Sequence, residues 1–102
     1  MQIKTKKTGQ KLTVKLIGEL DHHSARTFAE QLDALVAIGN IYIIELDLKG
    51  LDFMDSSGIG VILGRYKKLK SKGGRMYVTN ENKTVGKIFH LSGLYQLIEK
   101  IG

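Results

Sequence analysis

Residues 51–64 read LDFMDSSGIGVILG and join two segments of different periodicity. The run before them, IYIIELDL at residues 41–48, is β-branched and nearly continuously apolar, which is typical of a central strand covered on both sides in its first half. From Ser56 to about Lys72 the apolar residues recur at helical spacing, which predicts a core face of Ile59, Ile62, Leu63, Tyr66 and Leu69. We therefore expect a buried strand that leads into the N-terminus of an amphipathic helix, where free backbone N–H groups favour anions.

The other side of this predicted helix is nearly free of side chains. At about 100° per residue, Ser57 lies roughly opposite the apolar face. Val61, Gly64 and Lys68 share its stripe, with Gly60 just beside it. A glycine inside a helix costs about 1 kcal/mol relative to alanine. We therefore expect a solvent-facing Ser57 hydroxyl, and close approach by another backbone or a ligand is one candidate compensation for the two glycines.

The rest of the chain alternates strands with helices. Residues 1–18 predict a hairpin that turns at Thr8-Gly9 and ends at Gly18. The further predicted elements are a helix over 22–38 with Asp21 as its N-cap, a strand over 75–79, a short helix to about Leu91 capped by Asn80 or Asn82, and an edge strand from Gln96. The order β-β-α-β-α-β-α-β predicts an α/β fold with a mixed, mainly parallel sheet of four to five strands and helices packed against it.

Length and composition narrow the class of protein. The 102 residues predict one domain over 1–102, and no apolar run approaches the ~20 residues of a membrane span. The absence of cysteine excludes disulfides and thiolate metal sites, and no apolar segment typical of a signal peptide follows the first lysines. We therefore expect a cytoplasmic protein.

Basic residues give the chain a net charge of +6 and gather in residues 4–15 and 67–75. This excess either attracts nucleic acid or an acidic partner, or forms a solvated lysine surface. The aromatic residues are few and scattered, so no stacking platform for bases is apparent.

Other kinds of site are weakly supported. The adjacent His22 and His23 would face different ways on a helix, so no metal site is expected. Ser57 does not follow the Gly-x-Ser-x-Gly pattern of a hydrolase nucleophile, and the glycines at 58, 60 and 64 do not have dinucleotide-binding spacing. We therefore expect no enzyme and no cofactor.

A family resemblance adds to this interpretation. Residues 55–66, DSSGIGVILGRY, closely resemble the phosphorylation-site segment of bacterial anti-sigma factor antagonists, which are single-domain STAS proteins. Within that family the chain is most similar to antagonists of the sporulation sigma-F switch. Residues 18–23, 75–78 and 89–94 match further family segments, and the resemblance covers about residues 10–98. Family members continue into a C-terminal helix, which is expected to be missing or very short here because the sequence ends at Gly102.

The resemblance implies a STAS fold and a phosphorylation switch. The serine before Gly-x-Gly, Ser57, would be the phosphoacceptor, with Ser56 as the alternative acceptor and the expected pure helix cap. Asp55, which precedes the helix, would either cap it or accept hydrogen bonds from loop N–H groups, and the resemblance suggests that it also helps to present Ser57 to a kinase. The unmodified protein would bind an anti-sigma factor with serine kinase activity and release the sigma factor. Phosphorylation would end that binding, and a serine phosphatase would reset it. ATP and Mg²⁺ would belong to the kinase.

The same resemblance suggests where the partner binds. The carboxyl ends of neighbouring parallel strands lie together, so the loops at Asp21 and Asp55 should be neighbours. The expected partner surface is Asp21, His22, Asp55, Ser56, Ser57, Gly58, Gly60, Val61 and Gly64. The alternatives are a STAS module of another stress or lipid-transport complex and, less favoured, a basic nucleic-acid-binding module. The resemblance favours a protein partner over DNA or a membrane.

Overall fold

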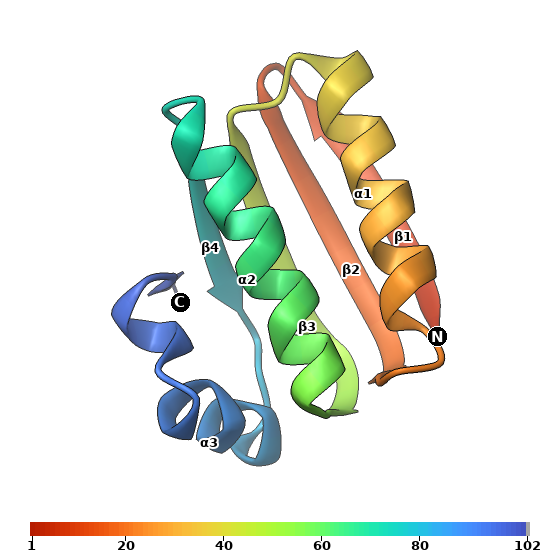
Figure 1. The fold of residues 1–102 in the computed structure, drawn as a ribbon, viewed down its shortest axis with the longest axis vertical. Coiled ribbons are helices and arrows are strands. Elements are labelled where there is room, and N and C mark those ends of the chain that lie inside the picture. The colour runs from red at the N-terminus through yellow and green to blue at the C-terminus, as the bar shows by residue number, and fades with distance from the viewer. Residues whose placement is uncertain (102) are drawn as a thin grey trace.

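A five-stranded sheet forms the centre of the structure, a computed structural model in which residues 1–101 are described (Figure 1). Its strands lie in the order β1-β2-β3-β4-β5. Only β1 and β2 pair antiparallel, and the other neighbours are parallel, so the predicted mixed, mainly parallel sheet is confirmed. The strands are β1 (Gln2–Thr8), β2 (Lys11–Leu20), β3 (Ile43–Met54), β4 (Arg75–Thr79) and β5 (Glu99–Lys100).

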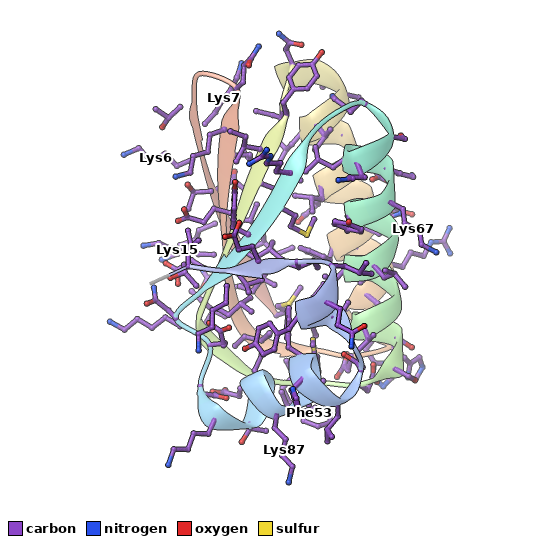
Figure 2. All side chains as sticks on the ribbon, turned by 90° about the vertical axis from the view of Figure 1, so that its left-hand side faces the viewer. Lys6, Lys7, Lys15, Phe53, Lys67 and Lys87 are labelled. Carbon is purple, nitrogen blue, oxygen red and sulfur yellow. The ribbon has the colours of Figure 1, made fainter. Side chains whose placement is uncertain are left out.

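Three α-helices connect the parallel strands in the predicted order. They are α1 (Ala25–Gly39), α2 (Ser56–Ser71) and α3 (Lys83–Leu91), and a short 3₁₀ helix at Leu94–Gln96 precedes β5. Helices α1 and α2 lie side by side across one face of the sheet, and α3 lies near the carboxyl end of β4 (Figure 1). In the perpendicular view, α1 and α2 lie on one side of the sheet and Lys6 and Lys15 on the other (Figure 2).

The core lies between the sheet and the helices α1 and α2, and the buried Val85 and Phe89 of α3 continue it. Alternate residues of β2, β3 and β4 point into it and are buried; they are Leu12, Val14, Leu16, Ile44, Leu46, Leu48, Met76 and Val78. The prediction that the first half of β3 is covered on both sides holds fully for one face only, because residues 43–48 alternate between half-buried and buried. Neighbouring side chains shield the second face of β3, as Lys11 does where its Nζ lies 3.0 Å from Glu45 Oε1. On α2 only Ile62 and Leu69 of the predicted core face are fully buried.

Several boundaries differ from the prediction because β2 and β3 pair over a longer stretch. Strand β2 continues through Gly18, which adopts φ +110° beside a register shift, to Leu20. Strand β3 correspondingly extends to Met54, which pairs with Leu20. Helix α1 starts at Ala25, later than predicted, since a turn occupies residues 21–24. The last strand is only two residues long because the 3₁₀ helix takes up the chain before it.

Candidate functional site

The turn between β3 and α2 is organised by Asp55. Its Oδ1 accepts hydrogen bonds from the backbone N–H groups of Ser57 at 2.9 Å and Gly58 at 3.1 Å. Asp55 is therefore the N-cap of α2, and the expectation that Ser56 is the pure cap is wrong. The carboxylate suits this position because its negative charge faces the positive end of the helix. Ser56 is instead the first residue of α2, and it is exposed.

Asp55 also ties this turn to the loop that follows β2. Its Oδ2 accepts a hydrogen bond from the backbone N–H of His22 at 3.1 Å, and its own N–H donates to the carbonyl of Leu20 at 3.3 Å. The expectation that the loops at Asp21 and Asp55 are neighbours is confirmed. One carboxylate thus fixes the spacing between the two loops of the candidate surface.

The loop after β2 is ordered by Asp21. Its Oδ1 accepts from the N–H groups of His23 at 3.0 Å and Ser24 at 3.1 Å. Burial works against ionisation, but the N–H groups of Ser24 and His23 outweigh it and lower the pKa of Asp21 below the ordinary value of 3.8. The prediction that Asp21 is the N-cap of this helix is therefore wrong: Asp21 caps the turn that leads to α1. Ser24 occupies the N-cap position, and its hydroxyl bonds to Glu19 and Asp21 and not to the helix N–H groups.

Ser57 lies in the first turn of α2 and is half-buried. Its hydroxyl makes no hydrogen bond to the other described residues, and it is not one of the enclosed side-chain atoms that lack a partner. The hydroxyl therefore reaches solvent. Its backbone is held by Asp55, so the hydroxyl sits on a fixed part of the helix.

The three glycines of α2 have different surroundings. Gly58 is buried, and a Cβ atom at this position would lie 2.3 Å from the carbonyl oxygen of Leu20. At Gly60 and Gly64 such an atom would meet no described atom within 4 Å apart from the chain neighbours and the backbone of the same helix. Gly58 therefore packs inside the fold and offers little to a partner, whereas Gly60 and Gly64 leave an open strip. Val61, between them, is half-buried and packs against the core.

The two histidines were expected to face different ways on a helix, but they lie in the turn before α1, where their tilted rings contact each other. Their ring centroids are 4.1 Å apart, and both residues are exposed. Within residues 1–101 no group of three or more His, Cys, Asp or Glu side chains could hold a metal ion. A hollow of about 550 Å³ beside His23 is lined by Glu19, Asp21 and Asp52, among others.

Phe53 was not among the expected site residues. It lies in β3 two residues before Asp55, and 43% of its surface is exposed. Figure 2 places it at the same end of the molecule as Lys87 of α3. From sequence, β3 was expected to stop at residue 48, so Phe53 was not assigned to a strand. Its exposure could be expected from strand alternation only if the end of β3 at Met54 were known.

The structure and the sequence both have close counterparts among known proteins. A curated relative, the anti-sigma F factor antagonist of Paenibacillus polymyxa, is 46% identical over 87 residues, which cover 85% of this chain and 74% of the relative. A solved structure of the anti-sigma factor antagonist SpoIIAA in its unphosphorylated form superposes with a TM-score of 0.87 at 31% identity, covering 99% of this chain and 89% of that chain.

A second solved structure is the Bacillus cell fate determinant SpoIIAA in the phosphorylated form. It gives a TM-score of 0.78 at 30% identity and covers 99% of this chain and 92% of that chain. The family model for the STAS domain matches residues 2–102. Among the described residues, no helix has the length and hydrophobicity that crossing a membrane requires. With its sheet order, its helices and these matches, the chain belongs to the STAS domain family.

Proposed function

We propose that this protein is a single-domain anti-sigma factor antagonist controlled by phosphorylation of Ser57. The observation that carries the proposal is the outer side of the first turns of α2, where a solvent-reaching hydroxyl lies beside glycines with open space above them. The relatives named above support it, since one is an anti-sigma F factor antagonist and another is known in a phosphorylated form.

The unmodified surface would bind the anti-sigma factor. Gly60 and Gly64 let a partner approach the backbone of α2, and the loop at Asp21 and His22 extends the contact sideways. Exposed Phe53 supplies an aromatic side chain of the kind that anchors protein interfaces. Binding at this surface would displace the sigma factor from its inhibitor.

Phosphorylation would act on the interface and leave the fold intact. The kinase transfers the γ-phosphoryl group of ATP to Ser57 Oγ, releasing ADP and the hydroxyl proton. The phosphate adds about −1.5 to −2 charges at a helix N-terminus, where negative charge is favourable. The same charge beside the Asp55 carboxylate is strongly hydrated, and covering it with a partner would be unfavourable. A serine phosphatase would restore the binding form, while ATP and Mg²⁺ belong to the kinase.

The direct test is phosphate transfer by a candidate cognate anti-sigma factor kinase. The protein is incubated with the kinase, Mg²⁺ and ATP, and the modified residue is located by mass spectrometry. We expect one phosphate on Ser57, none on Ser57→Ala, and normal incorporation into the matched variant Ser56→Ala. Phosphate on Ser57→Ala would contradict the assignment of Ser57 as the acceptor, and Ser56 would be the next residue to test.

Binding measurements with Ser57 variants test the effect of phosphorylation on the interface separately from phosphate transfer. Ser57→Ala is expected to stay bound to the anti-sigma factor in the presence of ATP. Ser57→Asp is expected to bind weakly while its melting temperature remains that of the wild type. A strongly lowered melting temperature for Ser57→Asp would argue for unfolding as the cause of release, against the interface mechanism.

A further inference from the structure

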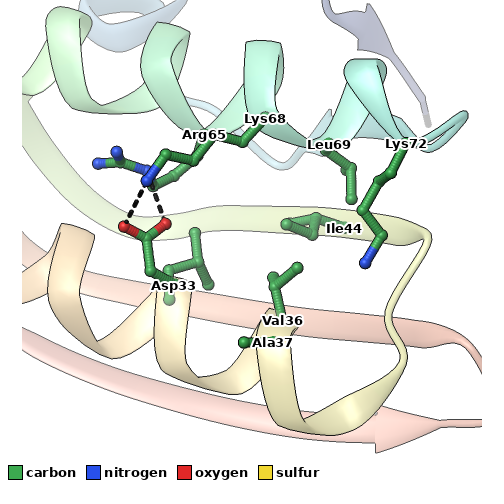
Figure 3. Close-up of a pocket in the computed structure, with 9 residues that line it drawn as sticks. Asp33, Val36, Ala37, Ile44, Arg65, Lys68, Leu69 and Lys72 are labelled. Carbon is green, nitrogen blue, oxygen red and sulfur yellow. Dashed lines mark hydrogen bonds and ion pairs between the residues drawn. The ribbon is translucent and has the colours of Figure 1, made fainter.

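A groove between α1 and α2 lies away from the Ser57 surface. It has a volume of about 380 Å³ and opens between Asp33, Val36 and Ala37 on α1 and two lysines on the other side, Lys68 of α2 and Lys72 directly after it (Figure 3). Small-molecule sites in proteins commonly range from about 300 to 1,000 Å³. Ser57 is separated from Lys68 by about 16 Å along the axis of α2, so the groove is a different place on the molecule.

The inner part of the groove is apolar. Ile44 of β3 and Leu69 of α2 form its base, and Val36 and Ala37 of α1 form one wall. Ala37 is exposed and Val36 half-buried, so an apolar guest would cover surface that now faces water. The small side chain of Ala37 leaves room for such a guest.

The rim of the groove carries more positive than negative charge. Asp33 faces two cations, since Arg65 Nε lies 3.0 Å from its Oδ1 and Lys68 Nζ lies 3.0 Å from its Oδ2 (Figure 3). The third cation, Lys72, lies with its Nζ 4.7 Å from the centre of the Tyr42 ring. No carboxylate of residues 1–101 pairs with Lys72. The rim thus has three cations and one carboxylate, and that carboxylate pairs with only two of them.

Arg65 also shows that the Asp33 carboxylate does not supply hydrogen bonds to all the cations of the rim. Its side chain is 14% exposed, and its Nε is enclosed yet makes no well-aligned hydrogen bond, although it lies at ion-pair distance from Asp33. Figure 3 shows the Lys72 side chain pointing from the C-terminal end of α2 toward α1, on the side of the groove that Val36 and Ala37 line. A second anion at this position would meet a cation that has no acidic partner and would lie next to apolar surface.

We propose that this groove binds a small amphiphilic anion, consisting of a short apolar chain with one carboxylate or phosphate group. The apolar chain packs on Val36 and Ala37, and the anionic group pairs with Lys72 and Lys68. The inner part of the groove offers apolar contact and the rim offers positive charge. A molecule with an apolar chain and an anionic group can contact both parts at the same time.

The test is a titration of the ¹⁵N-labelled 102-residue chain with octanoate and with octyl phosphate, followed by amide chemical shifts. We expect saturable shifts in α1 and in the second half of α2, with a dissociation constant of about 1 mM or tighter. Octanol lacks the charge and acetate lacks the chain, so both are expected to bind at least about tenfold more weakly. Binding of only one of the two probes identifies the head group as carboxylate or phosphate.

Paired variants distinguish a site from general attraction to a basic protein. Lys72→Gln is expected to weaken octanoate binding about fivefold, whereas Lys67→Gln, which removes the same charge from an exposed position outside the groove, changes it less than about twofold. Ala37→Phe, which fills the groove, is expected to abolish binding of both probes. Equal weakening by Lys72→Gln and Lys67→Gln, saturation by octanol as tight as by octanoate, or no saturable shift with either probe would overturn the proposal.

Discussion

The two sides of the first turns of α2 contain glycine for opposite reasons. On the inner side, Gly58 is buried, and the carbonyl oxygen of Leu20 occupies the place of a missing Cβ at 2.3 Å. On the outer side, Gly60 is exposed, and apart from its chain neighbours and the backbone of its own helix nothing described lies within 4 Å of the corresponding point. Packing within the chain explains the first glycine and leaves the second unexplained. The comparison separates residues that build the fold from residues that leave space for something outside it.

The largest expected effect is at the inner glycine. Gly58→Ala places a methyl group against a backbone carbonyl, so either α2 or the end of β2 must move. Overpacking of this kind typically costs about 1–3 kcal/mol, and we expect a loss at the upper end of that range. The free energy of unfolding, measured in urea, is compared with that of Gly60→Ala. Equal stability of the two variants would show that the inner glycine is not required by packing.

The next largest effect is expected at Asp55, which connects the first turn of α2 to the loop after β2. Asp55→Ala removes the cap of α2 and the bond to the His22 N–H, and a lost N-cap costs about 0.5–2 kcal/mol. Asp55→Asn keeps one carbonyl oxygen for the cap but presents an amide group to His22. We therefore expect an intermediate loss in urea unfolding for Asp55→Asn. Equal losses for the two variants would assign the whole effect to the bridge between the loops.

The outer glycine is expected to show a smaller effect of the opposite sign. Gly60→Ala should raise the free energy of unfolding by up to about 1 kcal/mol, because alanine is the better helix former and the position is open. Gly60→Leu should weaken binding to the anti-sigma factor while the protein remains folded. Urea unfolding and a binding titration measure the two properties separately. Unchanged affinity for Gly60→Leu would remove the strip from the proposed interface.

The sequence predicted most of the fold because its elements have clear periodicity. The apolar alternation of β2 and the helical spacing around Ile62 and Leu69 both correspond to buried faces. The boundaries at Gly18 and Met54 were missed because they depend on pairing between β2 and β3, which local sequence does not specify. A glycine after an alternating run indicates a strand end, whereas here the sheet accommodates Gly18 at positive φ and continues.

The candidate site was predictable in position but not in detail. That the loops at Asp21 and Asp55 meet follows from the parallel sheet, and the hydrogen bond from His22 to Asp55 confirms it. The helical projection placed Gly60 correctly on the outer side. From sequence both Asp55 and Ser56 were possible caps, and the preference for Ser56 was wrong. Both residue types cap helices well, and only the extended backbone at Asp55 decides between them. The helical projection also did not show that Gly58 packs closely against Leu20, which is distant in sequence.

The smallest expected effect is the pH dependence of stability that Asp21 contributes from the loop after β2. Its pKa is lowered in the folded protein, so its contribution to stability is present above the ordinary value of 3.8 and is lost as the pH falls through the folded value. Between about pH 6 and about pH 3, the wild type should therefore lose more stability in urea unfolding than Asp21→Asn. Asp52→Asn removes the same charge from an exposed neighbour and controls for the change in net charge. If both variants follow the same pH profile, the N–H groups of His23 and Ser24 do not hold the Asp21 carboxylate in its ionised form, and the loop owes its order to Asp55 alone.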